Sequence, residues 1–141
     1  MKRYAYPARF SRVQDGITVT FPDLPEAITG ESDLDETMAE AADCLQEAIA
    51  GRIVRREEIP EPSEPKRGQR MIPVALYLAP KLALYLAMRE QGVNNSELAR
   101  RLGVTEIIIR RMLTPRHNTK PEKIQAALAA LGKRIAIVEA A

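Results

Sequence analysis

The chain has 141 residues, of which 45% are hydrophobic and 28% are charged, so it can bury a core and is not a disordered protein. Its 21 Lys and Arg residues against 19 Asp and Glu residues give a net charge of only +2. The single cysteine, Cys44, excludes a disulfide framework and a cysteine-based zinc cluster, and it fits a reducing cytoplasm.

This near-neutral total hides a charge difference between the two halves of the chain. Residues 1–65 carry 7 basic and 14 acidic side chains, a net charge of −7, whereas residues 66–141 carry 14 basic and 5 acidic ones, a net charge of +9. Such an asymmetry predicts two units with different partners, and the basic unit is a candidate for nucleic-acid binding.

No targeting or membrane segment is expected. The N-terminus lacks the apolar run of a signal peptide. Residues 71–88 are apolar and close to the lower limit for a membrane span, but they include Lys81 and two prolines. We therefore expect a buried strand, a break at Pro80 and a buried helix there.

The first half predicts a small sheet covered by one helix. Apolar and polar residues alternate in 3–10 and 17–21, and the Asp-Gly step at 15–16 between them favours a hairpin. Pro7 favours an edge position or a bulge for the first strand, and residues 27–30 suit a short third strand.

A helix is predicted to begin with Ser32 as its N-cap, followed by an apolar stripe at three- and four-residue steps. Cys44 lies beside this stripe, where a small packed thiol is expected rather than a reactive one. The stripe consists of Leu34, Met38, Ala41, Leu45, Ala48 and Ile49.

Residues 57–69 contain three prolines and predict an exposed, extended connector. The alternation in 70–77 then predicts a strand that returns to the sheet, with Pro73 favouring an edge. The expected order for a first domain, residues 1–78, is therefore β-β-β-α-β.

Residues 79–141 predict an all-α second domain with a helix-turn-helix at 94–113. Asn95 and Thr105 suit the N-caps of two short helices, and Gly103 permits the tight turn between them. With the local positive charge, this pattern favours DNA binding. The alternative is a helical bundle with a solvated basic face.

A second helix lying in the major groove would present six residues to the bases, of which Arg110 or Arg111 suits guanine and Glu106 suits cytosine. Ile107 or Ile108 would contact either a thymine methyl group or a second subunit. His117 is expected to be a loop residue near phosphate rather than a metal ligand or an acid–base group. The six residues are Thr105, Glu106, Ile107, Arg110, Arg111 and Thr114, and the residues better suited to phosphates are Arg100, Arg101, Arg116, Asn118 and Lys120.

A last helix is predicted from Pro121 to Gly132, followed by a weak strand over 134–138. A strand without a local partner could pair with its copy in a second subunit. This pattern favours a homodimer or homotetramer.

Several stretches together resemble the HicB antitoxin family: residues 6–10, 15–16, 17–25 (ITVTFPDLP), 26–30 and 60–63. The sequence ELARRLGV at 97–104 and the helix start at 119–121 resemble its helix-turn-helix subgroup. The resemblance covers essentially the whole chain. It implies an α+β protein with a partial RNase H-like domain that masks a HicA-type ribonuclease toxin, and a DNA-binding domain that represses the toxin–antitoxin operon.

The residues themselves predict no enzyme, because no nucleophile–base pair is present and the hairpin region supplies only Asp15 and Asp23 as carboxylates. We expect no cofactor and no metal. An acidic surface would complement a basic, RNA-binding toxin. The candidates for this surface, expected to cluster at the end of the sheet, are Asp15, Asp23, Glu26, Glu31 and Asp33.

Two other functions compete with this interpretation. A stand-alone helix-turn-helix repressor with a ligand-sensing N-terminal domain would share the same second half, but the first half has few aromatic residues and little length for a pocket. A metal-dependent nuclease conflicts with the placement of the carboxylates.

Overall fold

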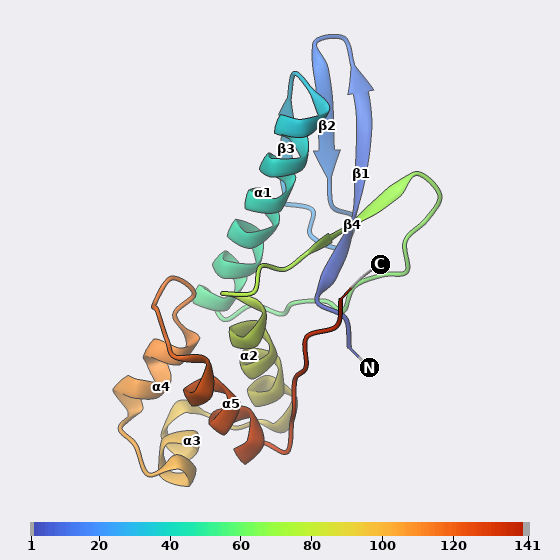
Figure 1. Ribbon diagram of the computed structural model, residues 1–141. Helices are drawn as coiled ribbons and strands as arrows, with labels where there is room; N and C mark the ends of the chain where they lie inside the picture. Colours follow the sequence, from blue (N-terminus) through green and yellow to red (C-terminus); the bar gives the residue numbers. More distant parts are fainter. Residues whose placement is uncertain (1, 140–141) are drawn as a thin grey trace. The chain divides into compact units, whose positions relative to one another are not determined.

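The computed structural model describes residues 2–139 and divides the chain into two compact units, Met1–Leu76 and Tyr77–Ala141. The first unit has the element order β-β-β-α-β, and every element of the second is a helix (Figure 1). The predicted α+β fold class is therefore confirmed.

The first unit contains one antiparallel sheet with the strand order β3-β2-β1-β4. Strands β1 (Ala5–Val13) and β2 (Gly16–Thr20) form the predicted hairpin, with Val13 opposite Gly16. Strand β3 (Ile28–Glu31) pairs with β2, and β4 (Gln69–Pro73) pairs with β1. Strand β4 lies at an edge, as Pro73 predicted.

Strand β1 lies inside the sheet, so the expected edge position for the strand as a whole was wrong, although Pro7 itself has a partner strand on one side only. The first part of β1 pairs with β4, whereas its pairing with β2 begins only at Arg9. Pro7 lies opposite Met71 in a part of β1 with a single neighbouring strand. A missing N–H is tolerated where one side of a strand has no partner.

Helix α1 (Leu34–Val54) packs on β2, β3 and β4 and buries Ala41, Leu45, Ala48 and Ile49. Leu34, the first residue of the predicted stripe, is 41% exposed because it lies in the first turn.

The N-cap of α1 is Asp33, so the predicted cap at Ser32 was wrong by one residue. An Asp33 oxygen accepts the Glu36 N–H at 2.9 Å, and a carboxylate is also favoured at the positive end of a helix. The Ser32 hydroxyl donates to the Glu36 carboxylate at 3.4 Å instead.

The connector has no regular structure, but the expectation that all of it is exposed was wrong. Ile59 is only 5% exposed, and the buried Tyr6 hydroxyl donates to the Pro60 carbonyl at 2.7 Å. The Ser63 N–H donates to the Asp23 carboxylate at 2.8 Å. These contacts hold the middle of the connector against the sheet unit.

Strand β4 ends at Pro73, earlier than the predicted 70–77. The Val74 N–H still donates to the Tyr4 carbonyl at 2.8 Å, but the Ala75 N–H donates to the Gln46 side-chain oxygen at 2.9 Å. The Gln46 amide also donates to the Pro73 carbonyl at 3.2 Å. A side chain of α1 therefore replaces a strand partner at this point.

The second unit consists of α2 (Ala79–Gln91), α3 (Asn95–Leu102), α4 (Glu106–Leu113) and α5 (Pro121–Ala130). Pro80 lies in the first turn of α2, where its missing N–H has no helical partner to lose. Within residues 2–139, no helix is long and apolar enough to cross a membrane. The core includes Leu82, Leu84, Leu98, Ile109, Ile124 and Leu128.

The predicted final strand over 134–138 is absent from the described part of the chain. The segment is irregular, with Ile137 81% and Val138 74% exposed. A strand forms only where another strand supplies hydrogen-bond partners. The described part of this unit contains only helices, so the segment has no strand to pair with.

Candidate functional site

Helices α3 and α4 are joined by a turn over residues 103–105. The α3 N-cap is Asn94, whose side-chain oxygen accepts the Glu97 N–H at 2.9 Å, so the predicted cap at Asn95 was wrong by one residue. Gly103 adopts a left-handed backbone with φ of 68°, and the Val104 N–H closes the turn on the Ala99 carbonyl. Thr105 occupies the N-cap of α4 without a side-chain capping bond.

The two helices pack through a small apolar wedge. Leu98 and Ala99 of α3 and Ile109 and Met112 of α4 are all buried, with Ala99 only 5% exposed. A small side chain at position 99 permits close approach of the helices. This packing fixes one side of α4 and leaves its opposite side open to solvent.

The open side of α4 and its flanks hold the residues predicted to face bases. Ile107 is 54% exposed, Ile108 is half-buried and Ile109 is buried, so Ile107 is the isoleucine available to a partner. The exposed residues of this set are Thr105, Glu106, Ile107, Arg110, Arg111 and Thr114.

Several of these side chains already make local contacts. Glu106 accepts from the Ser96 hydroxyl at 3.2 Å and lies 3.9 Å from the Arg110 guanidinium. The Thr114 hydroxyl donates to the Arg110 carbonyl at 2.8 Å, which leaves it available to a partner only as an acceptor. Exposed ion pairs contribute little to stability, so a nucleic acid could replace the Glu106–Arg110 pair at small cost.

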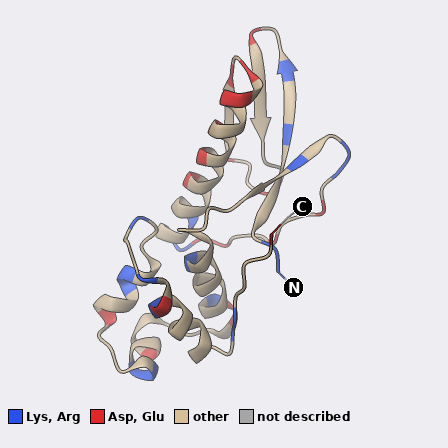
Figure 2. Cartoon of the chain, in the orientation of Figure 1, with Lys and Arg blue, Asp and Glu red and all other residues tan. Residues whose placement is uncertain are grey.

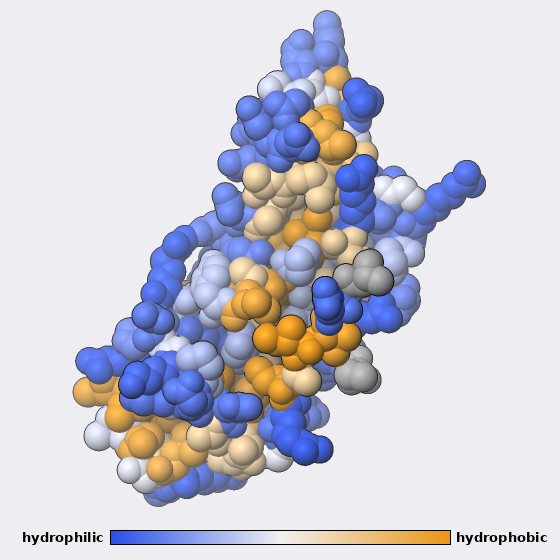
Figure 3. All heavy atoms as spheres, viewed as in Figure 1, coloured by the Kyte–Doolittle hydropathy of each residue, from blue (hydrophilic) through white to orange (hydrophobic). Residues whose placement is uncertain are grey.

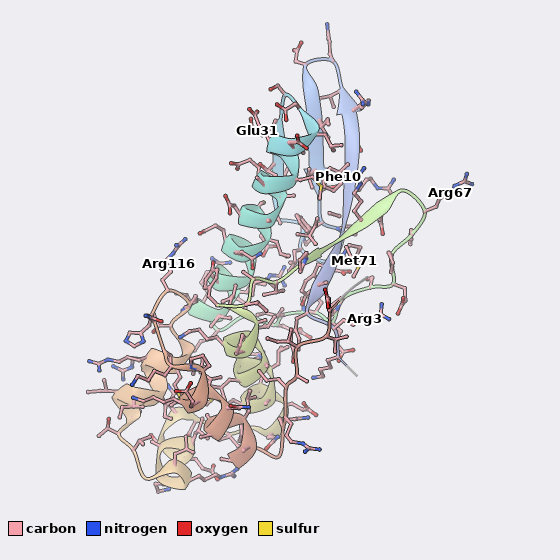
Figure 4. The ribbon with its side chains drawn as sticks, in the orientation of Figure 1. Arg3, Phe10, Glu31, Arg67, Met71 and Arg116 are labelled. Carbon is pink, nitrogen blue, oxygen red and sulfur yellow. The ribbon has the colours of Figure 1, made fainter. Side chains whose placement is uncertain are left out.

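The residues predicted to contact phosphates flank this face. Arg101 lies at the end of α3 and pairs with Glu97 at 2.8 Å. Arg116, Asn118 and Lys120 are exposed on the loop between α4 and α5, where Figure 4 labels Arg116. Figure 2 shows the basic residues of α3, α4 and this loop in blue. Base-facing and phosphate-facing candidates are thus carried by neighbouring elements of one unit.

Lys81 of α2 belongs to this site, although the sequence analysis gave it no role. Its side chain is buried at 2% exposure, and the ammonium donates to the Arg111 carbonyl at 3.1 Å, the Met112 carbonyl at 3.0 Å and the Thr119 hydroxyl at 3.0 Å. Burial lowers the pKa of Lys81 to about 8. The signal available in the sequence was a single charged residue, Lys81, within the apolar run at 78–88.

His117 lies exposed on the same loop, with its Nδ1 3.0 Å from the Thr119 hydroxyl. Within the described residues, no three His, Cys, Asp or Glu side chains are grouped so that they could hold a metal ion. The contact that His117 makes is thus the one with Thr119 on the same loop.

The five acidic candidates of the first unit do not form one cluster. Asp15 precedes β2 and Glu31 pairs opposite Ile17 at the start of β2, so these two and the α1 cap Asp33 lie at the hairpin end of the sheet (Figures 2 and 4). Asp23 and Glu26 follow β2 and lie toward its other end. The length of β2 separates the two groups, so the expected single cluster was wrong.

Asp23 and Glu26 also have partners within their own unit. Asp23 holds the connector through Ser63, with bonds from both its N–H and its hydroxyl. Glu26 accepts two bonds from Arg52, at 2.6 and 2.8 Å, and these bonds lower the pKa of Glu26 to about 2. The hairpin end, where Figure 3 shows mostly hydrophilic side chains with some exposed apolar ones, is the more open acidic surface.

Cys44 is half-buried in α1, and burial raises the pKa of its thiol. A raised thiol pKa reduces the fraction of reactive thiolate. This environment fits the packed thiol expected from the sequence.

Comparison with known proteins places these features in a family. A family model described as the HicB_like antitoxin of bacterial toxin-antitoxin systems matches residues 4–83. The chain belongs to the HicB antitoxin family. Antitoxin HicB 2 of Photorhabdus laumondii is 38% identical over 137 residues, which cover 97% of each chain.

Other HicB relatives also match over most of their length. Antitoxin HicB of Escherichia coli K12 is 34% identical over 134 residues, covering 94% of this chain and 97% of the relative. Antitoxin HicB of Pseudomonas fluorescens is 28% identical over 140 residues, covering 98% and 96%. The chain is thus an antitoxin of a toxin–antitoxin system, a family of proteins that are not enzymes, which confirms the predicted membership of the HicB family.

The Glu26–Arg52 pair predicts a specific pH dependence of stability. The folded pKa of Glu26, about 2, is below its ordinary value of 4.5, so its stabilising contribution is present above pH 4.5 and is lost as the pH falls toward 2. Glu26→Gln should lower the free energy of unfolding at about pH 7 by roughly 1 kcal/mol or less, because the Glu26 side chain is 38% exposed and water weakens the ion pair. The loss should be smaller at about pH 3, where part of the contribution of the carboxylate has already gone.

Urea unfolding at the two pH values would measure this difference, with Glu64→Gln in the connector as the control. An equal effect of Glu26→Gln at both pH values would contradict the assigned role of the pair.

Proposed function

We propose that this HicB-family antitoxin neutralises a HicA-type ribonuclease toxin by covering its active site, and that it binds operator DNA to repress its own operon. The match to a HicB antitoxin over 97% of the chain, together with the family model over residues 4–83, is the observation that carries the proposal. The first unit, residues 1–76, carries 10 basic and 14 acidic side chains (net −4), and the second, residues 77–141, carries 11 and 5 (net +6), which supports two distinct partners. The protein would act in the cytoplasm, where such a toxin meets mRNA.

For DNA binding, α3 and α4 would form a helix-turn-helix with α4 in the major groove. Arg110 or Arg111 would donate two bonds to guanine, and Glu106 would accept from cytosine once it leaves Arg110. Arg101, Arg116, Asn118 and Lys120 would contact phosphates, which position the protein without reading sequence. The exposed side of α4 and its basic flanks support this assignment.

For toxin binding, the hairpin end would provide the acidic surface. Asp15 and Glu31 lie at this end together with Asp33, which also caps α1, whereas Asp23 and Glu26 lie toward the other end of β2 and bond Ser63 and Arg52. A toxin that binds mRNA requires a basic surface, so opposite charge would raise the encounter rate. Neutralisation would be steric, since the antitoxin carries no chemistry of its own.

The protein would act as a homodimer or homotetramer. Two copies of α4 related by two-fold symmetry would read the two halves of a palindromic operator. Ile107 would lie either at the interface between the copies or against a thymine methyl group.

Replacement of a base-reading arginine tests the DNA assignment. Arg111→Ala should cost about 1–3 kcal/mol in operator binding and relax the preference at one base position. Gel shifts with a set of singly substituted operator duplexes would measure both effects. Equal losses on operator and random DNA would show that Arg111 contacts only phosphate.

Charge reversal at the hairpin end tests the toxin assignment. The double variant Asp15→Lys/Glu31→Lys should slow association with the toxin about tenfold at low salt, and less at high salt, because it replaces attraction by repulsion. Surface plasmon resonance with an inactive toxin would measure the rates. The control is Glu64→Lys, and equal slowing by the control would contradict a defined acidic surface.

A further inference from the structure

The ammonium group of Lys81 is enclosed by the second unit and donates three hydrogen bonds. Two acceptors are the carbonyls of Arg111 and Met112 in the last turn of α4, and the third is the hydroxyl of Thr119 on the following loop. A single side chain of α2 therefore joins the end of α4 to the loop that leads to α5.

The position suits a positive charge. The last carbonyls of a helix have no partners within the helix and carry the negative end of its dipole. The Arg111 carbonyl also accepts the Thr114 N–H at 3.1 Å, but an apolar side chain at position 81 would remove the Lys81 donor from the Met112 carbonyl, and an unsatisfied buried polar group is costly.

Thr119 extends the connection through the loop. Its hydroxyl accepts from Lys81, approaches His117 Nδ1 at 3.0 Å and lies 3.5 Å from the Arg111 carbonyl. Its neighbours in sequence, Asn118 and Lys120, are both exposed. The hydrogen bonds on Thr119 thus fix the section of loop that carries two predicted phosphate contacts.

We propose that Lys81 is a positioning residue for operator recognition, which holds the end of α4 and the loop at 114–120 in one fixed geometry. This inference rests on the proposed DNA-binding function of α4. With the spacing fixed, Arg111 reaches a base edge while Asn118 and Lys120 reach the backbone of the same site. Lys81 itself contacts no DNA, because its ammonium is directed into the protein.

A residue that positions other contacts and a residue that contacts phosphate itself affect DNA affinity differently. Sequence-specific contacts require correct geometry, whereas binding to random DNA depends mainly on the number of phosphates that are neutralised. Loss of Lys81 should therefore weaken binding to the operator more than binding to random DNA. The salt dependence of random binding should not change, because no phosphate contact is lost.

The test uses the full chain and two duplexes of equal length, one from the region upstream of its own gene and one of random sequence. Lys81→Met keeps most of the side-chain volume and removes the donor. The variant should lower the affinity for the upstream duplex about tenfold, which is the effect of losing one good contact. It should lower the affinity for the random duplex by less than about twofold. Circular dichroism would establish that the variant is folded.

Lys133→Met is the matched control. It removes the same charge from the same unit, where Lys133 pairs with Glu90 at 3.5 Å. It should change the affinity for either duplex by less than about twofold. A tenfold loss on the upstream duplex for Lys133→Met as well would overturn the specific role of Lys81.

Two results with folded Lys81→Met would also overturn the proposal: unchanged affinity for both duplexes, or equal losses on both with a smaller salt dependence. If Lys81→Met does not fold, Thr119→Val decides, because it keeps both carbonyl bonds of Lys81. Thr119→Val should weaken binding to the upstream duplex alone, by about threefold, a value at the lower end for one intramolecular hydrogen bond, because two of the three Lys81 bonds remain. No change would overturn the proposal.

The unsubstituted chain distinguishes this inference from the proposed function. If it shows no preference for the upstream duplex, operator binding itself is wrong, and the role of Lys81 is wrong with it. If it does show the preference, only the variants decide the role of Lys81.

Discussion

Each unit of this antitoxin is small, and a small unit buries too little apolar surface to depend on hydrophobic packing alone. Both units add hydrogen bonds between distant parts of the chain. In the first, Tyr6 bonds the Pro60 carbonyl and Arg52 bonds Glu26. In the second, Lys81 bonds the end of α4. These contacts hold the connector of the first unit against the sheet and fix the loop at 114–120 of the second unit relative to α4.

The same contacts determine which charges remain available to partners. Glu26 and Asp23 are used within the first unit, so its open acidic surface lies at the hairpin end. Lys81 is used within the second unit, and the exposed basic residues lie on α3, α4 and the loop that follows. Counting charges along the sequence predicts two partners. It does not distinguish the charged side chains that bond within the protein from those that are exposed to a partner.

Local patterns in the sequence predicted much of the fold. The Asp-Gly step at 15–16 identified the hairpin, and Gly103 identified the turn between α3 and α4, because both depend on neighbouring residues alone. Both capping residues, Asp33 and Asn94, were missed by one position. Two adjacent polar residues, Ser32 and Asp33 or Asn94 and Asn95, stand at the start of each of these helices, and local propensity does not distinguish between them.

Long-range contacts could not be predicted in this way. The connector was expected to be exposed because its composition is polar and rich in proline, but Tyr6 and Asp23 lie far from it in sequence. Lys81 suggested only that residues 71–88 do not cross a membrane, since its acceptors lie about thirty residues away. The acidic candidates were grouped by their nearness in sequence, whereas β2 separates them in space.

The central claim is that toxin and DNA bind different units, and separate expression of residues 1–78 and 79–141 tests it most directly. Isothermal titration of each folded fragment with the toxin encoded by the neighbouring gene, and with upstream DNA, gives four measurements. The account predicts that 1–78 binds only the toxin and that 79–141 binds only the DNA. A folded 1–78 fragment that fails to bind the toxin, while the full chain binds it, would contradict the account.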